Sequence, residues 1–164
     1  MFVLVCGGCS GERERPVGAV ELTRKHACAV CGMILVDFPG AKGQIHYTDG
    51  KYDVFCGTMD MFTYYWQPDT PKNIAAIYTN DMGDANWKTK WIDAKRAYYV
   101  CDAKKSGAMG DPFMPFLDEE KARNFVRLYG GEVLRFDNIT PDMLKPFQVH
   151  HRLPKPPTAA AQTQ

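Results

Sequence analysis

The sequence predicts an α+β fold of two small, similar ββαβ-type lobes packed into one compact unit. Three observations support this prediction. Segments with strand and helix periodicity alternate along the chain, and the order strand, strand, helix, strand recurs in its two halves. The chain has 164 residues, 45% of them hydrophobic, which suits a single compact unit. We assign the first lobe to residues 25–85 and the second lobe to residues 86–150.

The first half begins with a predicted strand at residues 31–38. A hairpin follows at residues 44–55, where apolar and polar residues alternate around Asp49-Gly50, a strong two-residue turn signal. Four apolar residues at spacings of four, three and four then predict one face of a helix that stops before a proline. These residues are Phe55, Met59, Phe62 and Trp66. A buried strand at residues 73–81 completes this half.

The second half repeats this order, with strands predicted at residues 96–103 and 112–118. A helix follows, with Asp118 as its predicted N-cap and two glutamates in its first turn, where the helix dipole favours acids. A glycine pair at residues 130–131 predicts the left-handed end of this helix. Residues 132–139 predict the last strand.

The first residues resemble the end of a bacterial lipoprotein signal, in which a cysteine sulfur receives diacylglycerol. An apolar stretch and two glycines precede Cys9. A secretory signal also has a basic n-region and an apolar region of about 7–15 residues. No Lys or Arg precedes Cys9, so the lipoprotein hypothesis places the true start upstream or takes the chain as truncated; the alternative is an ordinary apolar strand. We expect residues 1–8 to be a signal remnant, Cys9 to be lipidated and residues 9–24 to be a tether.

Charge and hydropathy exclude several classes of protein. The net charge is +1 without a basic block, so nucleic acid is not an expected partner. No run of about 18 apolar residues is present to cross a bilayer. The chain has no nucleophile elbow, phosphate loop or HExxH motif, and we therefore expect a protein that is not an enzyme. Residues 151–164, rich in proline, alanine and glutamine, predict a disordered tail.

The segment HACAVCGM, residues 26–33, contains the Cys28–Cys31 pair, for which three interpretations compete. A structural zinc site usually needs a second such pair, and the chain lacks one. A thioredoxin-type pair opens a helix, whereas the residues that follow here are strand-like. Cu(I) prefers thiolate and thioether ligands, and residues i and i+2 of a strand share a face. We therefore expect Cys31 and Met33 to bind Cu(I), with Cys28 as a further ligand.

Additional donors are expected from both lobes. Met82 and Met109 each lie beside glycine in a predicted turn, and we expect Met109 of the second lobe to close over the copper. His26 and His46 are weaker candidates, and for His46 an exposed position on a strand is the alternative. Cys56 precedes the first predicted helix, where it is either a thiolate favoured by the helix terminus or a buried apolar thiol.

Four segments resemble the NosL family: CGMILVDFPGAKGQIHY, IYTNDMGDANW, AYYVCDAKKSGAMGDP and ARNFVRLYGGEVLRFDNIT. The resemblance runs from about residue 28 to residue 143. It aligns Cys31 and Met33 with the family's Cys-x-Met element, Met82 with its NDMG element and Met109 with its MG element. It implies a periplasmic, lipid-anchored copper chaperone. The implied task is copper delivery to the four-copper sulfide centre of nitrous oxide reductase, together with the NosDFY membrane complex.

Residues and resemblance together predict a Cu(I) carrier that acts by ligand exchange. The alternative is a periplasmic thiol oxidoreductase or thiol holdase that uses Cys28 and Cys31.

Overall fold

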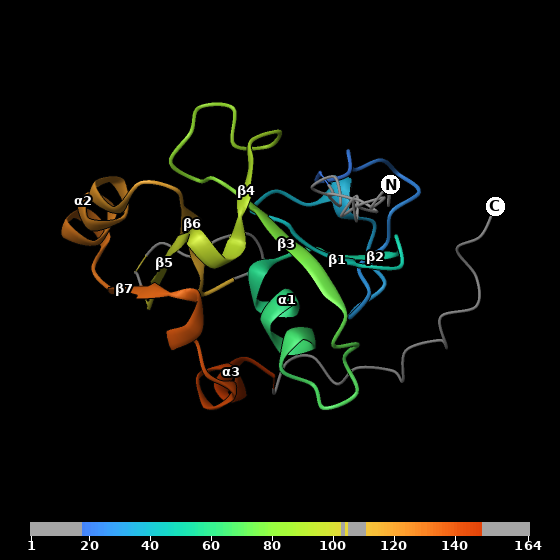
Figure 1. Ribbon diagram of the computed structural model, residues 1–164. Coiled ribbons are helices and arrows are strands. Elements are labelled where there is room, and N and C mark those ends of the chain that lie inside the picture. The colour runs from blue at the N-terminus through green and yellow to red at the C-terminus, as the bar shows by residue number, and fades with distance from the viewer. Residues whose placement is uncertain (1–17, 103, 105–110, 149–164) are drawn as a thin grey trace, which may run out of the picture.

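The computed structural model describes residues 18–102, 104 and 111–148 (Figure 1). Several sequence predictions fall outside these residues, namely those for residues 1–8, Cys9, Met109 and residues 151–164. Within the described residues the strands form two antiparallel sheets, the first from residues 43–93 and the second from residues 98–135. The predicted α+β class is therefore confirmed.

The first sheet has four strands. They are β1 (Gly43–Tyr47), β2 (Tyr52–Phe55), β3 (Ile74–Asn80) and β4 (Trp91–Asp93). Their order in the sheet is β2-β1-β3-β4, and the predicted turn at Asp49-Gly50 joins the first two, with Gly50 at φ +83°. Helix α1 (Thr58–Tyr65) follows β2 and packs against β1 and β2.

The second sheet has three strands. They are β5 (Tyr98–Cys101), β6 (Met114–Phe116) and β7 (Glu132–Arg135). Helix α2 (Glu119–Tyr129) connects β6 to β7, and α3 (Pro141–Gln148) ends the described chain. The sheet order is β6-β5-β7, which repeats the order β2-β1-β3 of the first sheet. Both halves thus have the predicted ββαβ arrangement.

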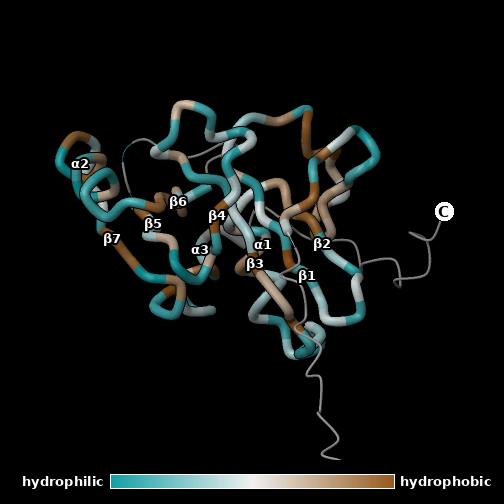
Figure 2. Tube along the Cα trace, turned by 45° about the horizontal axis from the view of Figure 1, so that its top comes forward, coloured by the Kyte–Doolittle hydropathy of each residue, from teal (hydrophilic) through white to brown (hydrophobic). Residues whose placement is uncertain are grey.

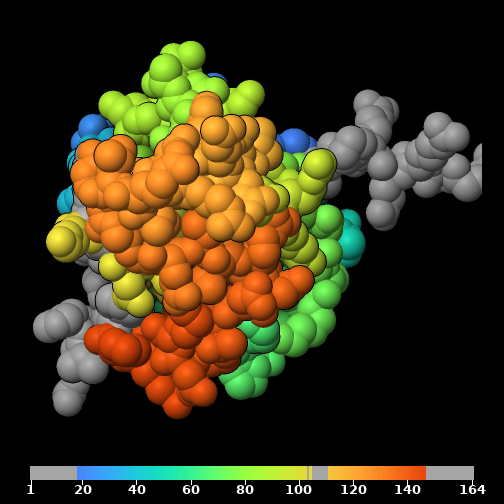
Figure 3. All heavy atoms as spheres, turned by 90° about the vertical axis from the view of Figure 1, so that its left-hand side faces the viewer, coloured from blue at the N-terminus to red at the C-terminus, as the bar shows by residue number. Residues whose placement is uncertain are grey.

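Helix α2 lies on the outer side of the second lobe (Figures 1 and 3). The Asp118 side chain accepts the backbone N–H of Lys121 at 3.0 Å, as expected of an N-cap. The helix is mixed brown and teal in Figure 2, because charged and apolar residues are interspersed along it. Ala122 is fully buried, whereas Leu128 is 75% exposed. Among the described residues, no helix combines the length and the hydrophobicity needed to cross a bilayer.

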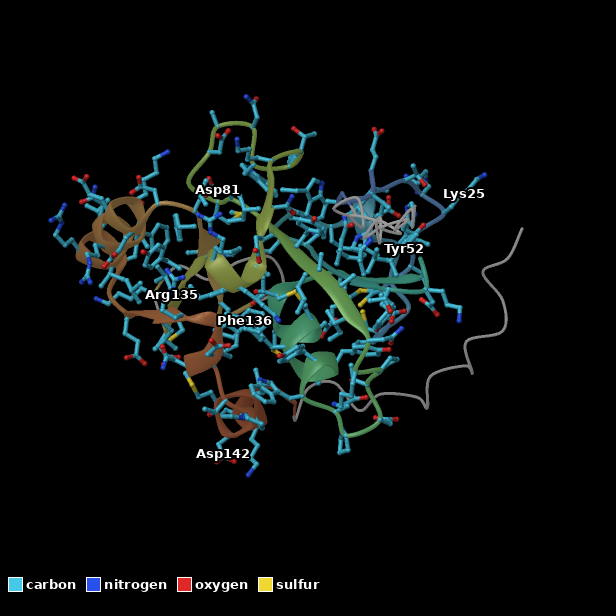
Figure 4. All side chains as sticks on the ribbon, viewed as in Figure 1. Lys25, Tyr52, Asp81, Arg135, Phe136 and Asp142 are labelled. Atoms are coloured by element: carbon cyan, nitrogen blue, oxygen red, sulfur yellow. The ribbon has the colours of Figure 1, made fainter. Side chains whose placement is uncertain are left out.

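An aromatic core joins the two lobes. Phe136 begins the short 3-10 helix η4 (Phe136–Asn138) after β7 and is 1% exposed. Its ring lies 4.9 Å from that of Phe62 and 5.1 Å from that of Tyr65, both on α1. The Phe62 ring also lies 5.2 Å from Tyr99 of β5. Phe136 accordingly lies between α1 and the strands of the second lobe in Figure 4.

The predicted strand at residues 31–38 is wrong. Gly32 has a φ of +75°, which turns the chain, and Leu35–Asp37 form the 3-10 helix η1. Ile34 makes a single β-bridge with Ala27. A short continuous apolar run does not alternate, and its periodicity therefore cannot distinguish a strand from a helical turn.

The first helix is shorter than its apolar spacing predicts. Phe55 ends β2, Gly57 is the N-cap of α1 and Trp66 is its C-cap. The sequence pattern does not predict β4, which has three residues, or α3, which contains Pro146. Proline inside a helix removes a backbone donor and argues against helix in a sequence pattern.

Part of the predicted tether packs on the first lobe. The Val20 N–H donates to Gln44 Oε1 at 2.9 Å, and Gln44 Nε2 donates to the Val20 carbonyl at 2.8 Å. Leu22 also packs against the main core. The residues from 18 onward therefore contribute to the folded unit.

Candidate metal centre

Three thiols and one carboxylate converge in the first lobe. Their ligand atoms all lie within 4.8 Å of one another, and they belong to Cys28, Cys31, Cys56 and Asp60. We call these four residues the thiol cluster. Cys28, Cys56 and Asp60 are buried, whereas Cys31 is half-buried and gives the cluster its contact with solvent.

A tight turn presents the first two thiols. The Cys28 N–H donates to the Met33 carbonyl at 2.8 Å, and the Gly32 N–H donates to the Cys28 carbonyl at 2.8 Å. The left-handed φ of Gly32 is one that other residues rarely adopt. The Ala29 N–H donates to the Val54 carbonyl at 2.9 Å, which fixes the turn to β2. Cys28 and Cys31 therefore lie over the end of β2, next to the start of α1.

The other two members come from the β2–α1 junction. Cys56 directly follows β2, and Asp60 lies four residues further on, in the first turn of α1. This spacing places both side chains on one side of the chain. Asp60 Oδ2 lies 3.1 Å from Cys56 Sγ and 3.3 Å from Cys28 Sγ, and Cys31 Sγ lies 3.5 Å from Cys56 Sγ.

The second lobe fixes the start of α1 beside the cluster. Asp111 accepts the Thr58 hydroxyl at 2.9 Å and the Met59 N–H at 3.2 Å. A Cβ on Gly57 would lie 2.5 Å from Asp111 Oδ2, and only glycine therefore allows this close approach. The sequence places Met109, outside the described residues, two positions before Asp111. Asp111 therefore ties the second lobe to the helix that holds Asp60.

Hydrogen bonds make Cys28 the most acidic thiol of the cluster. Its pKa falls from 9.0 to about 7, mainly because Cys56 donates to its sulfur, helped by the backbone N–H groups of Cys31 and Cys56. Burial and the Asp60 charge act in the opposite direction. Burial raises the pKa of Cys31 to about 11, and the hydrogen bond to Cys28 raises that of Cys56 strongly. At neutral pH the cluster therefore holds one readily ionised thiol and two protonated thiols.

A buried cation contributes to the electrostatics of the cluster. Lys42 is 7% exposed, and its ammonium group donates to the Gly40 carbonyl at 2.8 Å and to the Pro39 carbonyl at 3.2 Å. Burial lowers the pKa of Lys42, while Cys56, Asp111 and Cys28 act to raise it. The positive charge of Lys42 in turn favours negative charge on the thiol cluster.

Met33 and Met82, two predicted copper ligands, lie in different surroundings in the structure. Met33 is half-buried against the main core, its backbone N–H donates to the Cys31 sulfur, and it does not share a strand with Cys31. Met82 packs in a separate core with Phe116 and Ala122, and its N–H donates to the Pro115 carbonyl at 2.8 Å. Met82 therefore belongs to the packing of the second lobe.

Neither histidine candidate is a member of the thiol cluster. His26 Nδ1 accepts the Thr23 N–H at 2.9 Å, and its Nε2 lies 3.2 Å from the Tyr52 hydroxyl. His46 is 1% exposed, and its Nε2 lies 2.9 Å from Gln44 Oε1, so an exposed strand position is wrong for His46. The β1–β3 pairing accounts for this, because β1 is an inner strand and is buried along its length.

His46 gives a testable pH dependence. Burial lowers its pKa below the ordinary 6.5, so the unfolded chain takes up this proton more readily than the folded one. Neutral His46 contributes fully to the free energy of unfolding above pH 6.5, and this contribution is lost as the pH falls. Urea unfolding at about pH 7.5 and about pH 5 should show the wild-type advantage over His46→Gln narrowing at the lower pH. A difference that stays constant between the two pH values would contradict this role.

Sequence reasoning missed half of the thiol cluster. Asp60 is not among the residues that the sequence predicts as ligands. For Cys56 the sequence leaves two alternatives open, a thiolate favoured by the helix terminus and a buried apolar thiol. The available signal was the four-residue spacing of Cys56 and Asp60 at a predicted helix start. A second cluster in the described residues joins Cys101, Asp102 and Glu132, but it contains a single thiol.

Comparisons with known proteins agree with the sequence resemblance. A copper-binding lipoprotein NosL from Stutzerimonas stutzeri is 38% identical over 145 residues, which cover 84% of this chain and 75% of that protein. A copper-binding lipoprotein NosL from Achromobacter cycloclastes is 31% identical over 157 residues, which cover 87% of this chain and 81% of that protein.

A solved structure has the same fold. The crystal structure of the copper chaperone NosL from Shewanella denitrificans superimposes with a TM-score of 0.72 at 32% identity, covering 78% of this chain and 99% of that one. The family model of NosL matches residues 19–144, a range that contains both lobes and the whole thiol cluster. The chain therefore belongs to the NosL family.

Proposed function

We propose that this protein is a Cu(I) chaperone that carries the ion on its thiol cluster. It is not an enzyme in this proposal; copper is its cargo. The observation that supports it most directly is the convergence of three thiols from two separate segments, within 4.8 Å of one another and of Asp60. The relatives named as copper-binding lipoproteins and as a copper chaperone support copper as the metal.

The donor set favours Cu(I) over harder ions. Thiolate sulfur is a soft ligand that selects Cu(I), whereas a carboxylate oxygen suits hard cations. We therefore assign Cys28, Cys31 and Cys56 as ligands and Asp60 as the hydrogen-bond acceptor that orients the thiols. Metal binding requires deprotonated thiols, so copper loading at neutral pH releases protons from Cys31 and Cys56.

Two thioether donors complete the proposed ligand set. Met33 lies two residues from Cys31 and both pack against the main core, and Met109 lies two residues before the fixed Asp111. We propose both as weaker ligands that exchange during transfer. Met82, His26 and His46 are not included, because each packs or hydrogen-bonds elsewhere.

Copper transfer takes place at Cys31 in this proposal. Cys31 is the half-buried member of the cluster, and a partner's thiol or thioether therefore reaches the ion from its side. We propose that the receiving pathway is assembly of the four-copper sulfide centre of nitrous oxide reductase, with the NosDFY complex. The protein would act in the periplasm, lipid-anchored to a membrane through Cys9.

Competition for Cu(I) with a chromogenic chelator tests the ligand set. We expect tight stoichiometric binding by the reduced protein and a loss of more than about 100-fold in Cys31→Ser, because removing an outer partner of a metal site alone costs about 10- to 100-fold. Met33→Leu and Met109→Leu should each weaken binding by about 10-fold. Unchanged affinity in all three variants would refute the proposed site.

A second assay separates the carrier from the thiol oxidoreductase. Catalytic reduction of insulin disulfides that depends on Cys28 and Cys31 would favour the oxidoreductase. Its absence, together with stoichiometric Cu(I) binding by the same preparation, is the result we expect. The Cys28–Cys31 pair lies in a turn, whereas a thioredoxin-type pair opens a helix.

A further inference from the structure

Two thiols of the cluster lie close enough to form a disulfide. Cys31 Sγ and Cys56 Sγ are 3.5 Å apart, and both cysteines are free in this structure. A disulfide has an S–S distance of about 2.0 Å, so the two sulfurs need to approach by about 1.5 Å. The half-buried Cys31 side chain is the member that can make this movement.

The surroundings of the cluster favour this pair over the alternatives. Cys28 is 3% exposed, and its sulfur accepts the backbone N–H groups of Cys31 and Cys56 while lying 3.3 Å from Asp60 Oδ2. An external reagent therefore reaches Cys31 first. Once Cys31 has reacted, Cys56 is placed to attack it, because the two Sγ atoms lie 3.5 Å apart.

We propose that Cys31 and Cys56 form a reversible disulfide that switches the copper site off. This proposal rests on the proposed function, because it adds redox control to the same site. The oxidant is a low-molecular-weight or protein disulfide. The Cys31 thiol, the one that solvent reaches, gives its proton to the medium and attacks the disulfide; a mixed disulfide forms, and the first external thiol leaves with a proton from the medium. Cys56 then attacks Cys31 Sγ, and the second thiol leaves. The two cysteine thiols lose two electrons and two protons, and the external disulfide gains both as two thiols.

The switch follows from the shared use of two sulfur atoms. A sulfur in a disulfide is no longer a thiolate ligand, so the oxidised cluster keeps only Cys28 and Asp60 for the metal. Copper bound to Cys31 and Cys56 conversely occupies the sulfurs that the oxidant must attack. Oxidation and copper loading therefore exclude each other.

The test begins without copper. The full-length reduced protein is incubated with oxidised glutathione, alkylated and digested with trypsin for mass spectrometry. Cleavage after Lys25, Lys42, Lys51 and Lys72 separates the peptide with Cys28 and Cys31 from the peptide with Cys56. We expect a cross-link between these two peptides that persists in Cys28→Ser and disappears in Cys31→Ser.

The second step measures copper. The oxidised protein should bind Cu(I) at least about 100-fold more weakly than the reduced protein, and a phosphine reductant should restore binding. Protein loaded with Cu(I) beforehand should resist the cross-link. Cys101→Ser is the control, since its cross-link and copper binding should match those of the wild type.

Three results would overturn the switch. These are thiols that stay free after oxidation, a bond that joins Cys28 to either partner in place of the expected pair, and an oxidised protein with undiminished Cu(I) affinity. Failure of the reduced protein to bind Cu(I) is a different result, because it refutes the proposed function and leaves the mapped cross-link standing.

Discussion

Replacing Cys56 by serine should lower the Cu(I) affinity by more than about 100-fold, although sequence spacing alone does not make Cys56 a ligand. Cys56 Sγ lies 3.5 Å from Cys31 Sγ and 3.1 Å from Asp60 Oδ2, near the centre of the thiol cluster. Serine has a similar size, and its hydroxyl can still donate to Asp60. We therefore expect the thermal unfolding midpoint to stay close to that of the wild type. In the chelator competition, however, the variant should no longer take Cu(I) from the chelator.

Cys101→Ser is the matched control for Cys56→Ser. Cys101 is also a buried thiol beside a carboxylate, with its Sγ 3.6 Å from Glu132 Oε1. Burial raises its pKa to about 12, and the residues around it include no second thiol among those the structure describes. Cu(I) affinity should be unchanged in Cys101→Ser. Equal losses in the two variants would show that a general effect of buried thiols, not the thiol cluster, determines binding.

Replacing Phe136 by alanine should reduce the free energy of unfolding by about 3–5 kcal/mol, the usual range for truncation of a buried phenylalanine. The ring is 1% exposed and lies against Phe62 and Tyr65 of α1. Urea unfolding of the copper-free protein measures the change. The fraction of the variant that stays folded should also bind Cu(I) more weakly. The reason is that α1, which Phe136 supports, carries Asp60 and helps to fix the positions of the thiol cluster.

Leu128→Ala is the control for the aromatic core. Leu128 lies on α2 and is 75% exposed, so its truncation should change the free energy of unfolding by no more than about 0.5 kcal/mol. A loss in Phe136→Ala as small as in Leu128→Ala would mean that the two lobes do not depend on this core.

Much of the fold could be predicted because its signals are local. The Asp49-Gly50 turn requires a positive φ at Gly50, which glycine adopts readily. The alternating segments on both sides identify it as the turn of a hairpin. Helix α2 has an N-cap aspartate, an apolar stripe and a glycine end, and its bounds follow from them. The strand prediction for residues 31–38 is wrong because a short run of apolar residues is equally compatible with a turn and a 3-10 helix, in which Leu35 is buried and Val36 is exposed.

The candidate site could be predicted only in part. Two cysteines in eight residues identify the first segment, and soft-ligand chemistry indicates copper. The partnership with Cys56 and Asp60 could not be read from spacing, since 25 residues separate Cys31 from Cys56. The same limitation applies to His46, whose polar character predicts exposure but whose inner strand buries it.

The sequence by itself determined the α+β class, the repeated ββαβ order and the resemblance to the NosL family, because periodicity, turn residues and short motifs are properties of neighbouring positions. The tertiary structure alone decided which thiols meet. The backbone hydrogen bonds of the turn at Cys28, its attachment to β2 and the contact of Asp111 with the start of α1 set those positions. Side chains from distant segments come together only when the buried core fixes both backbones, and this condition has no local signature in the sequence.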